Sequence, residues 1–382
     1  MIAIAGAIGL SAMSAAACSS SITASSVSRP ATAPVPLASS LASATGTWAT
    51  IAMGHLDDPS NTFWQIFSLP AASSPWVLAT PPAVASNGGL VMSAGAPRSL
   101  TAGYEPFDLL RWSPLAQTGD GGAVWSPGVL PGALAAVPDS LAAATGPTRV
   151  ALLRSNGGDV LVSTGDLSAW KSVGSTEDLA ARGALPGCGV EALTAVGVLG
   201  NGDPIAGAAC THGGAAGILV LEGGRWHAVT ASLPASTSGP VSVIRLVGSV
   251  TGATALIRAG SGQGSRLFAA WSTDGLATWS VSSPLSMRNQ SLVSTGLTAG
   301  GGLIAVTSQA NGSRSAAVIE QTGGWRNLAP LPEGAGVVAS TSGAGFDALV
   351  VHQSTLDVDS LGAGGWSHDQ TIHVPIQYGS SG

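Results

Sequence analysis

The chain has 382 residues, a formal net charge of −6, and charged side chains at only 9% of its positions. This length exceeds what a single hydrophobic core usually organises, so we expect either two domains or one domain built from repeats. With 14 lysines and arginines in all, the chain cannot neutralise a phosphate backbone, which excludes DNA and RNA as partners.

The composition favours β-structure. Glycine occurs 53 times, and tryptophan, with 11 copies, outnumbers the 5 phenylalanines and 2 tyrosines. Such a chain is typical of short strands with tight turns rather than of long amphipathic helices. The mean hydropathy is +0.38. Beyond the N-terminus, however, no uninterrupted apolar run reaches the roughly 20 residues that a membrane-spanning helix needs.

Residues 1–17 form an apolar segment that ends in small residues and has the length of a signal peptide. The sequence Ala15-Ala16-Ala17-Cys18 resembles the lipobox of bacterial lipoproteins. This resemblance implies that Cys18 is lipidated and holds the protein on the outer face of the cytoplasmic membrane. The family usually has Leu at the position of Ala15, and no basic residue precedes Arg29, which a different start codon would explain. An ordinary secretory signal, or a buried first strand, is the alternative.

Residues 18–36 are rich in Ser and Pro, so we expect a tether there that carries the lipid at its first residue. From residue 37 onward, one Trp recurs every 41 to 56 residues. This spacing lies around the period of propeller blades. The recurring residues are Trp76, Trp125, Trp170, Trp226, Trp279, Trp325 and Trp366.

The sequence therefore predicts an all-β fold, a seven-bladed β-propeller of four-stranded antiparallel blades over residues 37–378. Six or eight blades, or a pair of β-sandwiches, are the alternatives. The expected blades cover about 37–80, 81–131, 132–185, 186–234, 235–285, 286–332 and 333–378.

Within a blade, each recurring Trp is expected to open the fourth, outer strand. The two strands expected first in the fourth blade are Glu191–Leu199 and Ile205–Cys210, separated by the turn signal Asn201-Gly202-Asp203-Pro204. In the fifth blade the corresponding strands are Val241–Gly248 and Ala253–Arg258.

Two stretches resemble the Asp box of sialidase-like (BNR-repeat) propellers, a motif that closes the hairpin between the third and fourth strands. The first has Ser272, Asp274, Thr278 and Trp279 in place, with Leu276 where the family has Gly. The second keeps Thr118, Asp120, Gly122 and Trp125, with Val124 where the family has Thr. A carboxylate followed by such residues can bond nearby backbone N–H groups. We therefore assign these residues a structural role.

If Cys18 takes the lipid, Cys188 and Cys210 remain as a pair in an oxidising compartment. A disulfide across the fourth blade is the expectation, and two separate buried thiols are the alternative. No spacing of ligands predicts a metal site, and no motif predicts a cofactor.

We expect a binding or assembly module, monomeric and without catalytic activity, that is envelope-anchored or secreted and touches the membrane through its lipid alone. Its partner is an unknown protein or glycan bound on one face, where scarce charged and polar residues fall in loops. The candidate residues are His55, Asp57, Asp58, Arg98, Tyr104, Glu105, Glu177, Asp178, Arg182, His212, Arg288, Arg314 and Glu333. The two longest of these loops are expected at Ser93–Pro106 and Gly174–Gly189.

The alternative function is a carbohydrate-active enzyme, either a glycoside hydrolase or a sialidase-like protein, that uses carboxylates near the central channel. Glu105, Asp108 and Glu191 are the candidates for such carboxylates. The sialidase pattern itself is missing: its Arg-Ile-Pro signature is absent, and Tyr104 is followed directly by Glu105 instead of meeting a Glu from another blade. We therefore name no catalytic residue.

Overall fold

The computed structural model describes residues 37–376 except for position 44 and the segments 57–60, 72–73, 82–88, 96–97, 105–114, 129–136, 145–149, 155–157, 164–166 and 342–344. The predicted signal segment, Cys18 and the tether lie outside the described residues. Within the described part of the chain, no helix is long and apolar enough to cross a membrane.

The described strands follow one another in four-stranded antiparallel units, as the sequence predicts. The first unit has β1 (Ala38–Ser43), β2 (Gly46–Gly54), β3 (Thr62–Leu69) and β4 (Val77–Leu78). The second has β5 (Leu90–Ser93), β6 (Leu100–Tyr104), β7 (Leu115–Thr118) and β8 (Ser126–Gly128). The third has β9 (Ser140–Ala143), β10 (Val150–Leu153), β11 (Asp159–Ser163) and β12 (Lys171–Ser175), followed by α1 (Thr176–Ala181).

The later units are built in the same way. The fourth contains β13 (Val190–Val198), β14 (Pro204–Cys210), β16 (Ile218–Glu222) and β17 (Arg225–Ala228), beside the short pair β15 (Ala215–Ala216) and β18 (Ala231–Ser232). The fifth contains β19 (Val241–Gly248), β20 (Ala253–Ala259), the 3-10 turn η2 (Gly262–Gly264), β21 (Arg266–Ser272), β22 (Ser280–Val281) and β23 (Leu285–Ser286). The sixth contains β24 (Gln290–Leu297), β25 (Leu303–Gln309), β26 (Arg314–Ile319) and β27 (Arg326–Asn327). The last contains β28 (Ala335–Ser340), β29 (Phe346–His352), β30 (Thr355–Gly362) and β31 (Gly365–His373).

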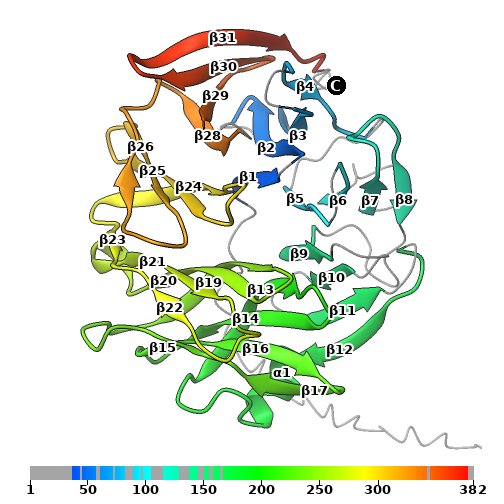
Figure 1. Cartoon of the computed structure of the whole chain (residues 1–382), viewed down its shortest axis with the longest axis vertical. Helices are drawn as coiled ribbons and strands as arrows, with labels where there is room; N and C mark the ends of the chain where they lie inside the picture. Colours follow the sequence, from blue (N-terminus) through cyan, green and yellow to red (C-terminus); the bar gives the residue numbers. More distant parts are fainter. Residues whose placement is uncertain are drawn as a thin grey trace, which may run out of the picture.

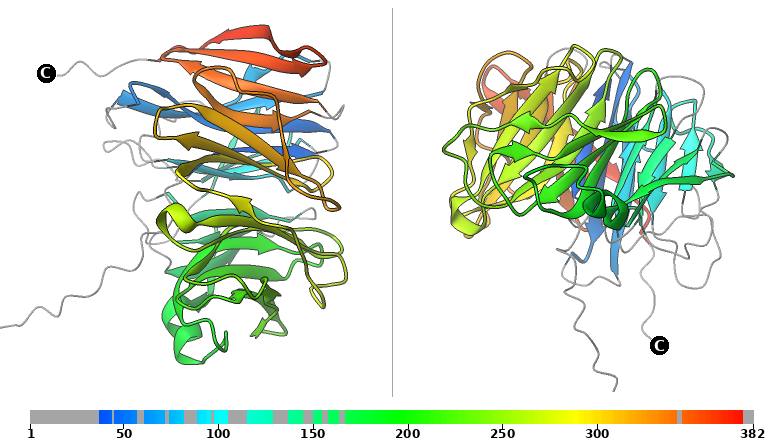
Figure 2. Two further views of the ribbon diagram at one scale, coloured as in Figure 1. Left: turned by 90° about the vertical axis from the view of Figure 1, so that its left-hand side faces the viewer. Right: turned by 90° about the horizontal axis from the view of Figure 1, so that it is seen from below.

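These units stand side by side around a common centre, with their first strands innermost (Figures 1 and 2). The arrangement is that of a β-propeller. Each recurring Trp lies at the start of an outer strand, as predicted: Trp279 directly precedes β22 and Trp325 precedes β27. The strands expected in the fourth and fifth units occur within one residue of their predicted ends.

The hydrophobic core is divided into layers between neighbouring units. Between the fourth and fifth units, Ile205 and Ile218 pack against Val243 and Phe268, all of them fully buried. Because both faces of a unit are covered, its middle strands are apolar along most of their length, as in β25. Burying an apolar side chain of this size stabilises the folded protein by about 1.5–3 kcal/mol. The interfaces between units therefore account for much of the stability.

The ring closes in an unexpected way. β1 pairs with β24 of the sixth unit in parallel, from Ala38 opposite Ser294 to Leu41 opposite Leu297. The seventh unit packs behind this junction, where Ser40 Oγ donates to Val338 O of β28 at 2.8 Å and Thr47 Oγ1 donates to Ser340 O at 2.8 Å. The centre is therefore surrounded by β1, β5, β9, β13, β19 and β24, and β28 is set back from it.

Candidate functional site: the central channel

Most of the described residues predicted for the binding face lie in or next to the connections between strands. Glu177 and Asp178 lie in α1, and Ser175 caps this helix by accepting a hydrogen bond from Asp178 N. Arg314 is the first residue of β26, and its Nη1 donates to the carbonyls of Gly334 and Ala335, next to Glu333. The exposed residues of this set are His55, Arg98, Glu177, Asp178, Arg182, His212, Arg288 and Glu333. No ion pair joins any two of the described candidates.

For two of these residues, the predicted placement in loops of that face is wrong. Arg98 lies between β5 and β6, on the face opposite the proposed loops, where its Nη2 donates to Asp120 O at 2.7 Å. Tyr104 lies at the end of β6 rather than in a loop and is 4% exposed. Burial raises the pKa of the Tyr104 hydroxyl to about 12. Asp57, Asp58, Glu105 and Asp108 lie outside the described residues.

The two long loops also contain regular structure. The stretch expected as a loop at Ser93–Pro106 includes β6, whose small residues Thr101, Ala102 and Gly103 fit between neighbouring units. The stretch at Gly174–Gly189 contains α1, where Ser175 and the two acidic residues after it form a favourable helix start.

The two aspartate turns form the hydrogen bonds expected from their sequences. Asp274 Oδ1 accepts from Ser272 Oγ and from Thr278 N, and its Oδ2 accepts from Thr278 Oγ1. The Thr278 hydroxyl is the main reason why the pKa of Asp274 falls to about 2. Asp120 accepts from Thr118 Oγ1 and from the amides of residues 123 and 124, and its pKa is lowered mainly by the Val124 amide.

In the turn around Asp274, Leu276 occupies the position where an Asp box has Gly. This residue has a φ of 74°, a left-handed conformation that is strained for Leu. Its side chain is 3% exposed and packs into the core between the fourth and fifth units. The burial of Leu276 therefore offsets the strain of its backbone. In both turns, the aspartate accepts hydrogen bonds from groups of its own turn.

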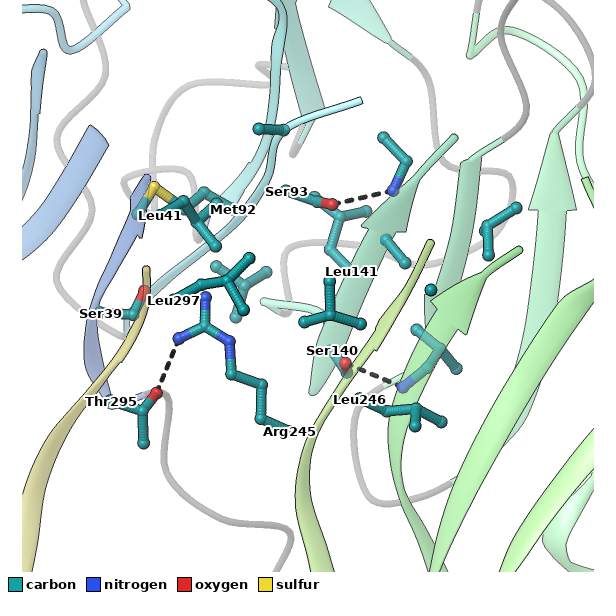
Figure 3. Close-up of a pocket in the computed structure, with 18 of the residues that line it drawn as sticks. Ser39, Leu41, Met92, Ser93, Ser140, Leu141, Arg245, Leu246, Thr295 and Leu297 are labelled. Carbon is teal, nitrogen blue, oxygen red and sulfur yellow. Dashed lines mark hydrogen bonds between the residues drawn. The ribbon is translucent and has the colours of Figure 1, made fainter. Parts of the chain in front are cut away.

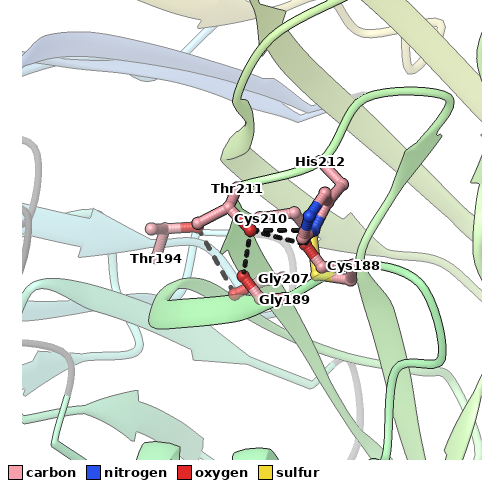
Figure 4. Close-up of a disulfide and its surroundings, with 7 residues drawn as sticks. All are labelled: Cys188, Gly189, Thr194, Gly207, Cys210, Thr211 and His212. Carbon is pink, nitrogen blue, oxygen red and sulfur yellow. Dashed lines mark hydrogen bonds between the residues drawn. A yellow bond between two sulfur atoms is a disulfide. The ribbon is translucent and has the colours of Figure 1, made fainter.

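Cys188 and Cys210 form the disulfide expected from the sequence (Figure 4). Both residues are buried, and Cys210 ends β14 while Cys188 precedes β13. The backbone around the bond is fixed further because Thr211 N donates to Gly189 O and His212 N donates to Cys188 O. The disulfide therefore fastens the two ends of the hairpin that supplies the fourth inner strand.

A cavity of about 220 Å³ occupies the centre of the ring (Figure 3). All six inner strands line it, and its wall continues into Gly200 and Ser249, the residues that follow β13 and β19. The cavity thus reaches the face that carries the Asp274 turn, because Gly275 N bonds Thr251 O within the turn after β19. This is the face opposite the predicted binding loops.

Serine and threonine side chains connect the inner strands around this cavity. Ser93 Oγ accepts from Ala143 N at 2.9 Å, and Ser140 Oγ accepts from Val196 N at 3.0 Å (Figure 3). Thr194 Oγ1 donates to Val243 O at 2.7 Å. The first strands are thereby held in register without a continuous backbone ladder, which gives the cavity a rigid wall.

Arg245 of β19 places its side chain in this cavity (Figure 3). Its Nη1 donates to Thr295 Oγ1 at 2.9 Å and its Nη2 donates to Ser40 O at 3.1 Å. The side chain keeps some accessible surface toward the channel, yet protein surrounds it. Burial lowers the pKa of Arg245 to about 10, so the guanidinium stays cationic at neutral pH.

Both hydrogen-bond acceptors of Arg245 are neutral oxygens. Among the described residues, no carboxylate lies within ion-pair distance of the guanidinium. Asp139 also lines the cavity, directly before β9. A guanidinium has five N–H donors, so the two bonds to Thr295 and Ser40 leave donors for a further acceptor. A charge that is surrounded by protein and has no partner of opposite sign is costly. This distinguishes Arg245 from the other residues that line the channel.

A β-bulge lies directly before Arg245. The register of β19 shifts between Val243 and Arg245, and the same shift occurs in β13 before Ala195 and in β24 before Ser294. Bulges re-aim the side chains next to them. At this repeated position the neighbouring units carry a methyl or hydroxymethyl group, whereas the fifth unit carries a guanidinium. Sequence analysis missed Arg245, although the charge inside the apolar strand Val241–Gly248 is a usable signal.

A second cavity, of about 270 Å³, lies between the third and fourth units. Its wall combines Val162, Val173 and Leu221 with Lys171 and Asp203. Ser163 Oγ is buried there without a hydrogen-bond partner. This cavity has a mostly apolar wall and shares Val198 of β13 with the wall of the channel.

Comparison with solved structures returns β-propellers. A glycoside hydrolase family 74 xyloglucanase from Xanthomonas campestris is similar with a TM-score of 0.53 and 13% identity, over 86% of this chain and 52% of the xyloglucanase. The BP39L lectin from Burkholderia pseudomallei has a TM-score of 0.49 at 13% identity, over 89% of this chain and 99% of the lectin. This chain thus spans about half of the xyloglucanase and nearly all of the lectin. At 13% identity, the likeness to the xyloglucanase shows the propeller fold alone.

No protein-family model matches the chain, and no curated protein is similar to it in sequence. The class of the molecule is therefore set by its fold, a β-propeller with a lined central cavity, and its function has to be argued from that cavity.

Proposed function

We propose that this protein is a binding module of the cell envelope, lipid-anchored or secreted, that holds a small ligand in its central channel. The observation that carries the proposal is the cavity of about 220 Å³, walled by six inner strands and containing the Arg245 guanidinium. Binding sites are typically concave, mainly apolar and furnished with a few fixed polar groups. The channel fits that description better than the scattered loop residues do.

In this proposal the turns around Asp120 and Asp274 have a structural role. Their sequences and hydrogen bonds are similar to Asp-box turns, and their carboxylates are occupied by their own backbone. We therefore propose that the turns hold the outer hairpins in place and leave recognition to the channel.

A channel-filling variant tests the proposal. Val247 follows Arg245 by two residues on β19, so both side chains lie on the same face of the strand, and both line the cavity. We expect Val247→Trp to fill the cavity. Ser367→Trp is the matched control, because it adds the same side chain at an exposed position of the outer strand β31.

The experiment incubates the purified mature protein with a mixed library of small metabolites and oligosaccharides, and identifies retained compounds by mass spectrometry. At least one compound should be retained by the wild type and by Ser367→Trp but released by Val247→Trp. Equal retention by all three proteins, or none by the wild type, would contradict the proposal. Turnover of a retained glycan would instead favour a carbohydrate-active enzyme.

A further inference from the structure

We infer that the ligand of the channel is a small monocarboxylate with an apolar body, whose carboxylate binds the Arg245 guanidinium. This inference rests on the proposed function, because it names the chemical class of the molecule that the channel holds. Three features of the cavity lead to it: the charge of Arg245, the apolar character of the wall and the size of the space.

The charge calls for a single anionic group. Arg245 donates to Thr295 Oγ1 and Ser40 O, which orient the guanidinium but leave its positive charge without an ion pair among the described residues. A carboxylate accepts two parallel N–H bonds from a guanidinium, and such charge-assisted bonds are roughly twice as strong as neutral ones. One cation matches one negative charge.

The wall beyond the guanidinium is apolar. Leu41, Met92 and Leu297 lie on the side of the guanidinium, and Leu141 lies across the cavity from it (Figure 3). The serine oxygens nearby already accept backbone N–H groups, as Ser93 does from Ala143 and Ser140 does from Val196. A sugar acid would lose the hydration of several hydroxyl groups and find mainly the O–H donors of these serines as partners. A short aliphatic or aromatic acid would bury its body against the leucines.

The size of the cavity suits a small acid. A volume of about 220 Å³ lies well above the roughly 10–15 Å³ that one ordered water needs. Acids the size of butyrate or benzoate are therefore small enough for this space.

Titration calorimetry on the mature protein tests the inference with benzoate and butyrate, each compared with its neutral amide. The amides have nearly the same shape but no charge. We expect both acids to bind the wild type and the amides to bind about tenfold more weakly or worse. Because this comparison needs no variant, it holds even if an Arg245 substitution disturbs folding.

Variants then assign the effect to one side chain. Arg245→Met keeps much of the stem and removes the charge, so the affinity for benzoate should fall about tenfold or more, to the level of benzamide. Arg245→Lys should give an intermediate affinity, because lysine keeps the charge but loses the planar fork. Arg225→Met is the matched control: it removes an exposed arginine of β17 that does not line the channel and should leave the affinity unchanged.

The remaining outcomes overturn the inference in distinguishable ways. Equal binding of acid and amide, or undiminished binding by Arg245→Met, would show that the charge is not used. If inorganic phosphate binds more tightly than either acid, the assignment to a carboxylate is wrong. If neither acid binds while Val247→Trp still releases another retained compound, the inference fails but the channel remains a binding site. If nothing depends on Val247, both proposals fail.

Discussion

Trp76 and Asp347 are joined by a buried hydrogen bond of 2.8 Å from the indole Nε1 to Oδ2, although 271 residues separate them in sequence. Trp76 is 2% exposed and Asp347 is 7% exposed. Gln370 strengthens the same junction, since its side chain accepts from Trp76 N and donates to Trp76 O. The first and last units of the propeller are therefore held together around one tryptophan.

Trp76→Phe should destabilise the protein by about 1–3 kcal/mol, because it leaves a buried carboxylate oxygen without its donor. Urea unfolding measures this change. Trp279→Phe is the matched control, since the Trp279 indole nitrogen is buried without a hydrogen-bond partner and the substitution breaks no such bond. A cost for Trp279→Phe as large as that for Trp76→Phe would show that ring volume, not the bond to Asp347, is what matters.

The penalty of Trp76→Phe should also grow as the pH rises. Burial raises the pKa of Asp347, whereas the bonds from Trp76 and Ser360 lower it. A raised folded-state pKa means that stability is lost as the pH climbs through that pKa. Removing Trp76 raises the pKa further, so the difference between wild type and variant should be larger at pH 7 than at pH 4. If the difference in unfolding free energy between wild type and Trp76→Phe is independent of pH, the indole does not affect the pKa of Asp347.

Asp274 should have the opposite pH dependence. Its folded pKa of about 2 lies below the ordinary value of 3.8, so its contribution is present above about pH 4 and is lost as the pH falls toward 2. Thermal unfolding should therefore show that Asp274→Asn lowers the melting temperature at pH 6 but has little effect near pH 2. Thr278→Val should reproduce part of the effect, because the Thr278 hydroxyl contributes most to the lowered pKa. An equal effect of Asp274→Asn at both pH values would contradict this role.

Removing the disulfide should cost about 3 kcal/mol, because the Cys188–Cys210 bond closes a loop across a sequence separation of 22 residues. The double variant Cys188→Ala, Cys210→Ala can be compared with the wild type by chemical unfolding with and without a reductant. Reductant should weaken the wild type and leave the double variant unchanged. Insensitivity of the wild type, with full reduction verified by thiol titration, would show that the bond adds nothing to stability.

Gly248→Ala should destabilise the wall of the channel. A Cβ at Gly248 would lie 2.0 Å from the backbone oxygen of Val198, so the fourth and fifth inner strands would have to separate. Overpacking of this kind costs about 1–3 kcal/mol. Gly264→Ala is the control, since nothing lies within 4 Å of a Cβ there. Calorimetry should show a lower melting temperature for Gly248→Ala alone, and equal effects of the two substitutions would contradict the close approach.

The repeat architecture could be predicted from sequence because its signals are local. Trp226 and Trp366 mark outer strands through their spacing, and the turn around Asn201-Gly202-Asp203 separates two strands whose ends the structure confirms within one residue. The disulfide follows from Cys188 and Cys210 flanking one hairpin. Each of these features depends on residues that are near one another in the chain.

The candidate site depended on long-range geometry and was predicted poorly. Tyr104 reads as a loop residue next to Glu105, yet the packing of β6 between units buries it. The sequence around Arg98 resembles one long loop, whereas the structure has the strand β6 directly after it, which puts Arg98 on the opposite face. Arg245 becomes a candidate binding residue only in the folded protein, where β24 and β1 place Thr295 and Ser40 within hydrogen-bond distance of it. No local sequence pattern predicts these long-range contacts.

The parallel pairing of β1 with β24 also sets an order of events during biosynthesis. Ala38 is paired with Ser294, so the second edge of the first strand has to wait for a segment about 250 residues downstream. At a synthesis rate of about 5–20 residues per second, this delay lasts roughly 10–50 s. Throughout that interval the nascent chain presents an open strand edge, a template for pairing with other chains. A chaperone that shields extended segments would therefore be expected to raise the yield of folded protein most when it acts before the sixth unit is complete.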